Sequence, residues 1–327
     1  MIEVMGLTKY YGSLAAIRDV NFNVSAGEIV GFLGPNGAGK TTTMRILTCF
    51  APATSGTVRI SGIDVGEDSM AVRRSIGYLP ENIPLYNWMR VRSYLEFVTR
   101  AKGVASSDRV KEIDRVSSVV GIEDVQTKLI RWLSKGYKQR LGLAQALIGD
   151  PPIIILDEPT IGLDPKQIRE IRNLIKGFAL NKTVILSSHI LPEVSHVCSR
   201  VIIINKGVIV AEDTPENLIS GSGRASRVQV TLRAPEHESK TLISGINGVS
   251  TVKTLTPLRE GMLTLTVESE WGKDIRPELA RSIVAKDWDL LDLRSIDVSL
   301  EDVFIDLVTE ESTDVLTKEN LMDREVA

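Results

Sequence analysis

The chain has 327 residues, of which 43% are hydrophobic, and a formal net charge of −3 at pH 7. This length favours two domains over one, and the hydrophobic content is sufficient for a sizeable core. The acidic balance argues against nucleic acid as the main partner, because phosphate backbones are usually bound by a basic excess.

Other features of the composition favour a cytosolic protein. The first seven residues contain neither the basic region nor the apolar core of a secretory signal. Cys49 and Cys198 lie far apart without metal-ligand spacing, so we expect buried, reduced thiols. No apolar run approaches the roughly 18 residues of a membrane span. If the protein serves a membrane process, we expect another chain to cross the bilayer.

A glycine-rich loop follows the first predicted strands. Hydrophobic patterning predicts strands over residues 2–7, 20–24 and 29–33. Residues 34–41 then read Gly-Pro-Asn-Gly-Ala-Gly-Lys-Thr, which fits G-x-x-x-x-G-K-[ST], and a helix is predicted from Thr41 to Cys49. Strand, loop and helix start form the context that a phosphate-binding loop requires.

The chemistry of this loop suits a nucleoside triphosphate. Glycines let backbone N–H groups surround an anion, and the helix start adds unpaired donors and partial positive charge. Lys40 is placed to reach the β- and γ-phosphates, and the Thr41 hydroxyl is placed to bind Mg²⁺. Pattern and context together favour this over a glycine-rich turn that binds nothing.

The hydrophobic pattern in the middle of the chain changes twice, from strand-like to helical and back to strand-like. After strands predicted at 56–60 and 75–79, residues from about 82 to 150 have helical periodicity, with Val91, Leu95 and Val98 followed by Val110, Ile113, Val116 and Val120. Continuous apolar runs at 153–156, 183–186 and 201–204 then suit strands of a parallel sheet covered on both faces. We therefore expect an α/β domain over residues 1–220 with an inserted helical subdomain.

Two acids end the strand at 153–156. A buried strand delivers Asp157 to the carboxyl edge of the sheet, where such sheets bind ligands and where the residue can hold Mg²⁺. Glu158 could polarise water for attack on the γ-phosphate. An exposed acidic turn, the alternative, does not account for so apolar a preceding run.

A second anion site is predicted at Leu133-Ser-Lys-Gly-Tyr137, which opens a helix. Ser134 is placed as its N-cap, and the Gly136 backbone and the helix dipole add to the site. On its own this pattern could be an ordinary helix start.

At this point the sequence resembles the ATP-binding cassette (ABC) family over essentially all of residues 1–220. Each motif stands in the family's order: Tyr11 as the adenine-stacking aromatic, 34–41 as Walker A, Pro80-Glu81 as the Q-loop, 133–137 as the signature, Asp157-Glu158 as Walker B, Asp164 as the D-loop and His189 as the switch histidine. The resemblance implies a P-loop NTPase fold and a head-to-tail dimer in which each ATP lies between Walker A of one subunit and the signature of the other.

The resemblance also implies the site residues. Catalysis is expected from Lys40, Glu158 and His189, and Mg²⁺ binding from Thr41, Asp157 and Glu81. The expected ATP ligands are Tyr11, Gly34, Pro35, Asn36, Gly37, Ala38, Gly39, Lys40, Thr41, Thr42, Ser134, Gly136 and Asp164.

The sequence departs from the usual ABC family pattern in three motifs. Glu81 replaces the Q-loop glutamine, Lys135 and Tyr137 replace signature glycine and glutamine, and Ile161 replaces the D-loop serine. Gly77-Tyr-Leu-Pro-Glu81 and Leu133-Ser-Lys-Gly-Tyr137 resemble the exporter branch that includes gliding-motility and drug- or antibiotic-export ATPases. Ser299-Leu-Glu-Asp-Val-Phe304 resembles the C-terminal extension of that branch.

Beyond a small polar linker, residues 227–310 predict a second domain, and 311–327 a polar tail. The order β-α-β-β-α-β suggests a small ferredoxin-like α+β domain. A stripe of Leu300, Val303, Phe304, Leu307 and Val308 predicts a packed helix. The domain contains no catalytic pattern, so we expect it to regulate or support dimerisation; a passive appendage is the alternative.

The sequence thus predicts the ATP-hydrolysing subunit of a bacterial ABC transporter, and it favours an exporter. We expect it in the cytoplasm, peripheral on the inner face of the membrane, paired with a second copy or a homologous ATPase and with permease subunits on separate chains. A soluble ABC ATPase of translation or DNA maintenance, and the ATPase of a motility or assembly machine without net transport, are the competing interpretations.

Overall fold

The computed structural model describes residues 1–178, 181–221, 227–255, 262–270, 273–296 and 300–305. The chain divides into two compact units, residues 1–215 and 216–327. The predicted domain boundaries, 1–220 and 227–310, stay a prediction.

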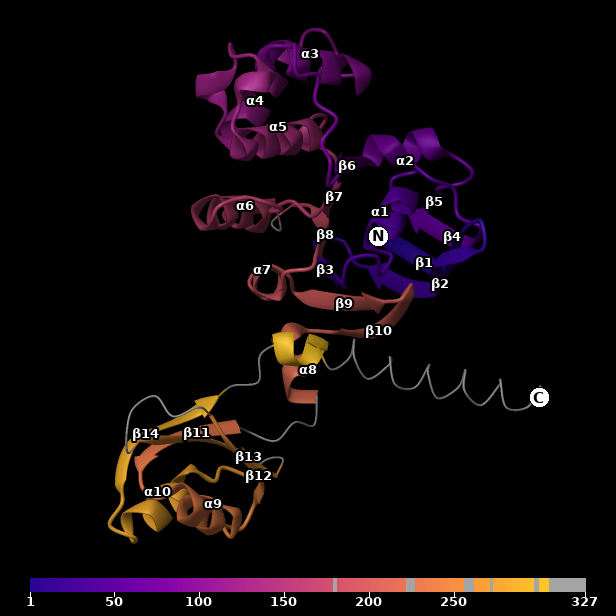
Figure 1. Ribbon diagram of the computed structural model, residues 1–327. Helices are drawn as coiled ribbons and strands as arrows, with labels where there is room; N and C mark the ends of the chain where they lie inside the picture. Colours follow the sequence, from indigo (N-terminus) through magenta and orange to yellow (C-terminus); the bar gives the residue numbers. More distant parts are fainter. Residues whose placement is uncertain (179–180, 222–226, 256–261, 271–272, 297–299, 306–327) are drawn as a thin grey trace, which may run out of the picture. The chain divides into compact units, whose positions relative to one another are not determined.

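A mixed sheet forms the centre of the first unit, with the strand order β10-β9-β3-β8-β7-β6 (Figure 1). Its strands are β3 (Ile29–Leu33), β6 (Ile76–Leu79), β7 (Ile153–Asp157), β8 (Thr183–Ser188), β9 (Arg200–Asn205) and β10 (Val208–Asp213). All neighbours pair in parallel except β10 with β9. Every residue of β3, β7 and β8 is buried, as expected for parallel strands covered on both faces.

A second, antiparallel sheet of the first unit has the order β2-β1-β4-β5. It contains β1 (Ile2–Tyr11), β2 (Leu14–Val24), β4 (Ser55–Ile60) and β5 (Ile63–Asp64). Helix α1 (Lys40–Leu47) and both sheets share one core, in which Phe22 and Phe32 lie 5.5 Å apart between ring centroids. Helix α2 (Ser69–Ser75) precedes β6. Helix α1 contacts β2 of this sheet and β7 of the central sheet, so the core fixes the helix that follows the glycine-rich loop.

Three helices form the predicted insertion and pack on one another, and α5 also lies against β6 of the central sheet (Figure 1). They are α3 (Val91–Ala101), α4 (Arg109–Val120) and α5 (Lys135–Leu147), with short 3₁₀ turns at Glu123–Val125 and Ile130–Trp132. Ser134 caps α5 as predicted, accepting a hydrogen bond from the Tyr137 N–H. One predicted core residue is wrong: Val110 is 58% exposed, because it is the second residue of α4 and the buried stripe begins one turn later.

Helices α6 (Pro165–Phe178) and α7 (Leu191–Ser195) follow β7 and β8. Gly31 of β3 is closely covered by α7, since a Cβ there would lie 2.1 Å from Val194 Cγ1. Helix α8 (Pro215–Gly221) begins at Pro215, since the fixed φ of proline suits the first position of a helix.

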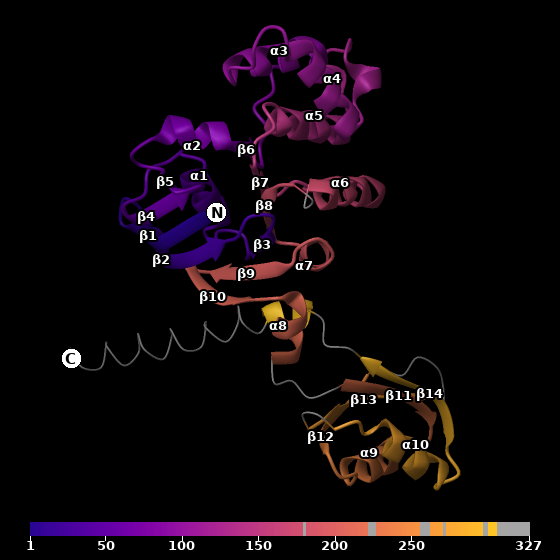
Figure 2. The ribbon, with the colours of Figure 1, turned by 180° about the vertical axis from the view of Figure 1, so that it is seen from behind.

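The second unit contains a four-stranded antiparallel sheet with the order β12-β13-β11-β14. In chain order its elements are β11 (Arg227–Arg233), α9 (Glu236–Ser244), β12 (Val249–Thr254), β13 (Leu263–Ser269), α10 (Arg276–Val284) and β14 (Asp289–Ile296). Both helices cover the same face of the sheet (Figure 2), and a buried apolar cluster fills the space between.

Residues 300–305 are helical, with Leu300 and Val303 buried and Phe304 half-buried. Ser299, Leu307, Val308 and the predicted tail 311–327 lie outside the described residues. Within the described ranges, no helix is both long and apolar enough to cross a membrane.

Candidate functional site

The loop of residues 34–39 leaves β3 and turns directly into α1. Gly34 lies close to the backbone of Ile204, because a Cβ at Gly34 would lie 2.4 Å from the Ile204 carbonyl oxygen. Gly39 has φ of 110°, in a region that favours glycine, and stands at the N-cap of α1 without a side-chain cap. The first N–H groups of the helix are thereby left for a ligand.

Lys40 is buried behind this loop, only 6% exposed. Its Nζ donates to the carbonyl oxygens of Gly34 at 2.8 Å and Pro35 at 3.3 Å. It also lies 3.4 Å from Oε1 of Glu158, whose side chain is equally buried. The structure therefore joins Walker A to the second acid of Walker B through one ion pair.

Glu158 is held between Lys40 and His189. Its Oε2 lies 2.8 Å from Nδ1 of His189, and its own N–H donates to Ser187 Oγ at 3.1 Å. The backbone of Glu158 has φ of +50°, which is uncommon for a residue other than glycine and is frequent at functional sites. The loop after β7 therefore places this carboxylate at a specific point of the sheet edge.

Asp157 lies at the end of β7 and is fully buried. Its Oδ1 accepts hydrogen bonds from Ser187 Oγ at 2.5 Å and Thr41 Oγ1 at 3.4 Å, while its buried Oδ2 has no partner among the described residues. Burial raises the pKa of Asp157, opposed by the hydrogen bonds from Ser187 and Thr41 and reinforced by the charges of Glu81 and Glu158. A buried carboxylate oxygen without a partner, beside a threonine hydroxyl, fits the oxygen ligands that Mg²⁺ prefers.

Lys40, Glu158 and His189 line a cavity of about 440 Å³ at the carboxyl edge of the parallel strands. It is lined by Ala16, Pro35, Asn36, Gly37, Gly39, Lys40, Thr41, Thr42, Glu81, Glu158, Ile161 and His189. The structure thus brings together most of the predicted phosphate, metal and catalytic residues.

Six predicted ATP ligands do not line this cavity. Gly34 and Ala38 belong to the glycine-rich loop itself, whereas Tyr11, Ser134, Gly136 and Asp164 lie outside it. Tyr11 lies in β1, 47% exposed, with Lys9 Nζ 5.2 Å from its ring centroid. Ser134 and Gly136 begin α5 in the helical subdomain, where Gly136 closely faces Gln167. Asp164 caps α6, accepting from the N–H groups of Lys166 and Gln167.

Ser187 is a site residue whose role the sequence reasoning missed. It contacts both acids, because its hydroxyl donates to Asp157 and accepts from the Glu158 N–H. Its signal was its place at the end of a predicted parallel strand, two residues before His189. The pairing of Asp157 with Ser187 across β7 and β8 fixes this contact.

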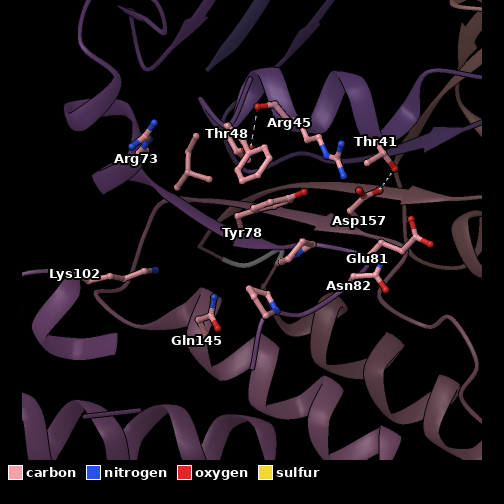
Figure 3. Close-up of a pocket in the computed structure, with 14 residues that line it drawn as sticks. Thr41, Arg45, Thr48, Arg73, Tyr78, Glu81, Asn82, Lys102, Gln145 and Asp157 are labelled. Carbon is pink, nitrogen blue, oxygen red and sulfur yellow. Dashed lines mark hydrogen bonds between the residues drawn. The ribbon is translucent and has the colours of Figure 1, made fainter. Parts of the chain in front are cut away.

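A second cavity, of about 460 Å³, begins beside the residues predicted to bind Mg²⁺ and extends to the helical subdomain (Figure 3). Thr41, Asp157 and Glu81 lie at one end, and Lys102 and Gln145 at the other (Figure 3). Burial lowers the pKa of Lys102 to about 8, while its ammonium donates to the carbonyl oxygens of Ala146 and Ile148. Phe50, at the rim, is 74% exposed.

Comparison with known proteins places these features in context. A family profile described as "ABC transporter" matches residues 17–161. The ABC transporter ATP-binding protein YhcH of Bacillus subtilis (strain 168) is 32% identical over 96% of this chain and 98% of its own length.

Two further relatives carry transport or resistance names. The linearmycin resistance ATP-binding protein LnrL of Bacillus subtilis (strain 168) is 29% identical over 94% of this chain and 98% of that protein. The bacitracin transport ATP-binding protein BcrA of Bacillus licheniformis is 40% identical over 65% and 69%, respectively.

The fold is also similar to a solved ATP-binding cassette. That cassette, a dimer in a post-hydrolysis state bound to ADP and Pi, is 28% identical and has a TM-score of 0.61. The likeness covers 65% of this chain and 98% of the cassette.

Proposed function

The chain belongs to the ATP-binding proteins of ABC transporters and is an ATPase of that type, and we propose that it drives membrane-spanning subunits that are separate chains. The observation that carries the proposal is the meeting of Lys40, Glu158 and His189 beside the Thr41–Asp157 pair. A phosphate anchor, a base and a metal position are needed together for hydrolysis.

We propose specific roles for these residues. Lys40 exchanges its contacts with Gly34, Pro35 and Glu158 for oxygens of the β- and γ-phosphates. Glu158, so released, accepts a proton from the attacking water while the bond between the γ-phosphorus and the bridging oxygen breaks. His189 orients Glu158 through the contact at 2.8 Å and lies in reach of the γ-phosphate position.

Thr41, Asp157 and Glu81 are the residues proposed to hold Mg²⁺. The buried Oδ2 of Asp157, which has no hydrogen-bond partner among the described residues, supports this assignment. When bound, Mg²⁺ supplies positive charge that offsets the negative charge of the phosphate oxygens.

A second cassette completes the proposed site. Ser134, Gly136 and Asp164 do not line the cavity that contains Lys40, whereas a head-to-tail dimer would bring the signature of one subunit onto the ATP of the other. The dimeric state of the solved cassette with ADP and Pi supports such an arrangement. ATP binding would close the dimer, and hydrolysis would reopen it.

The proposed cargo direction is export. LnrL and BcrA, which carry resistance and transport names, support this direction. We propose that the protein works in the cytoplasm on the inner face of the membrane.

The cavity in Figure 3 is the proposed contact for a short helix of a membrane subunit. Phe50 lines this cavity and is 74% exposed. Tyr86 and Trp88, which are 54% and 76% exposed, follow in sequence the lining residues Glu81, Asn82 and Pro84, and exposed aromatic side chains are typical of interaction surfaces. Because Glu81 lines both cavities, a helix seated here would touch the segment that also faces the nucleotide.

We assign the second unit to the ferredoxin-like type, on its element order and strand order. We propose that it supports or regulates dimerisation.

Copurification and crosslinking test the transport proposal. The affinity-tagged chain, extracted in detergent from its native cell, should retain integral membrane proteins. Cysteine introduced at Phe50 or Trp88 should crosslink to them, whereas cysteine at Val119, which is 39% exposed on α4, serves as the control. Recovery of ribosomes or DNA, or crosslinks equal to the control, would overturn the proposal.

A further inference from the structure

The outer edge of the second unit is formed by β14. This strand is paired with β11 on one side and with no further strand of the described residues on the other (Figures 1 and 2). An edge strand presents unpaired N–H and C=O groups that can accept another strand. Natural proteins commonly blunt such edges with proline, lysine or bulges.

The two edges of this sheet are protected differently. Strand β12 carries Lys253, whose side chain is 64% exposed. Strand β14 has eight residues, Asp-Leu-Leu-Asp-Leu-Arg-Ser-Ile, with neither proline nor lysine. Its one irregularity lies near Leu291, where its register with β11 shifts. Residues 292–296 continue beyond the shift as a regular edge.

The charges on this edge are self-complementary. Asp292 and Arg294 are opposite Thr231 and Gln229 of β11, while Leu293 is opposite the buried Val230. Asp292 and Arg294 therefore lie on the open face, with side chains 46% and 63% exposed. Arg294 is already oriented along this face, since it donates to Gln229 Oε1 at 3.0 Å and lies 3.6 Å from Asp292 Oδ2.

We propose that β14 pairs antiparallel with β14 of a second copy of this chain, about a twofold axis at Leu293. In that register Asp292 faces Arg294 of the second copy, and Arg294 faces Asp292, so both contacts of the isologous pair join opposite charges. Leu293 meets its own copy on the face that packs against the core. A shift of one residue would place Asp292 opposite Leu293 and lose both charge pairs.

This inference rests on the proposed function in one respect: the pairing would hold two cassettes together while their nucleotide site opens and closes. It predicts an association that needs no nucleotide. The ATP-dependent dimer through the signature is a separate contact.

Charge reversal in the full chain tests the register. Sedimentation velocity without nucleotide should show a dimer, and D292R or R294D should each raise its dissociation constant by about tenfold, because each converts two attractive contacts into two repulsive ones. The double variant D292R/R294D should restore association. K253E, on the opposite edge, is the matched control and should leave it unchanged.

Crosslinking gives a second measurement. With Cys49 replaced by serine, D292C mixed with R294C should form the mixed disulfide faster than either variant alone, because these positions are opposite each other only in the proposed register. A monomeric wild-type chain, a double variant no better than the single ones, or an effect of K253E equal to theirs would overturn the proposal.

Titration of ATP in the same variants separates this inference from the proposed function. Normal ATP binding with unaltered association would contradict the β14 pairing alone. If the wild-type chain does not bind ATP, the proposed nucleotide site is contradicted instead.

Discussion

Lys40 and Glu158 form a buried ion pair, with 3.4 Å between Nζ and Oε1 and only 6% of each side chain exposed. Burying such a pair costs hydration that the attraction between the two charges must offset. When a phosphate oxygen replaces Glu158 as the partner of Lys40, the buried ammonium keeps a negatively charged partner. The proposed general base and the proposed phosphate anchor are thus already in contact in the ligand-free protein.

Glu158→Gln should lower steady-state ATP hydrolysis by about 10²–10⁴-fold, the usual loss when a general base is removed. ATP binding should persist, because Gln retains the shape of the side chain and removes a negative charge facing the γ-phosphate. Phosphate release and equilibrium titration of Mg-ATP measure the two effects. Glu96→Gln, on the exposed face of α3, should behave as wild type; near-normal turnover in Glu158→Gln would exclude Glu158 as the base.

Asp157→Asn should stabilise the ligand-free protein at pH 7 while weakening Mg-ATP binding. Burial raises the pKa of Asp157, so the folded state binds more protons than the unfolded state just above the ordinary pKa of aspartate. Its stability therefore falls as the pH rises through that window and stays reduced above it. The variant should lack this fall and melt a few degrees higher at neutral pH.

Thermal melts of both proteins between pH 4 and 8 check this prediction, with Asp108→Asn as the control, because Asp108 is exposed and its side chain makes no cap hydrogen bond to α4. A lower melting temperature for Asp157→Asn at pH 7, with an unchanged pH profile, would contradict the burial argument.

Gly31→Ala should destabilise the first unit by about 1–3 kcal/mol, because the new Cβ would lie 2.1 Å from Val194 Cγ1. Val194→Ala removes that methyl group, so the double variant should be more stable than the sum of the single effects predicts, by at least about 0.5 kcal/mol. Urea unfolding measures all four proteins. Additive effects would mean that β3 and α7 do not pack as described.

Sequence reasoning predicted the motif-bearing parts of this fold well, since glycine spacing and unbroken apolar runs carry strong local signals. The phosphate loop, the cap at Ser134 and the parallel strands ending at Asp157 and Ser188 are in the structure as expected. Each depends on residues close together in the chain.

What could not be predicted depends on strands and side chains that are distant in sequence. Ser187 reaches Asp157 only because β8 and β7 pair in one register. The contact between Lys40 and Glu158 joins residues on two different elements. Strand β10 and helix α2 carry weak patterns and were missed, because their stability comes from neighbours rather than from local sequence.

The most direct test of the central claim is sedimentation velocity of Glu158→Gln in the presence of Mg-ATP, made in the D292R background so that any association through β14 is suppressed. The account predicts a dimer with Mg-ATP, a monomer with Mg-ADP, and a monomer in both when Lys40→Ala is added. A chain that binds Mg-ATP at saturation yet stays monomeric would contradict an ATPase site shared between two copies.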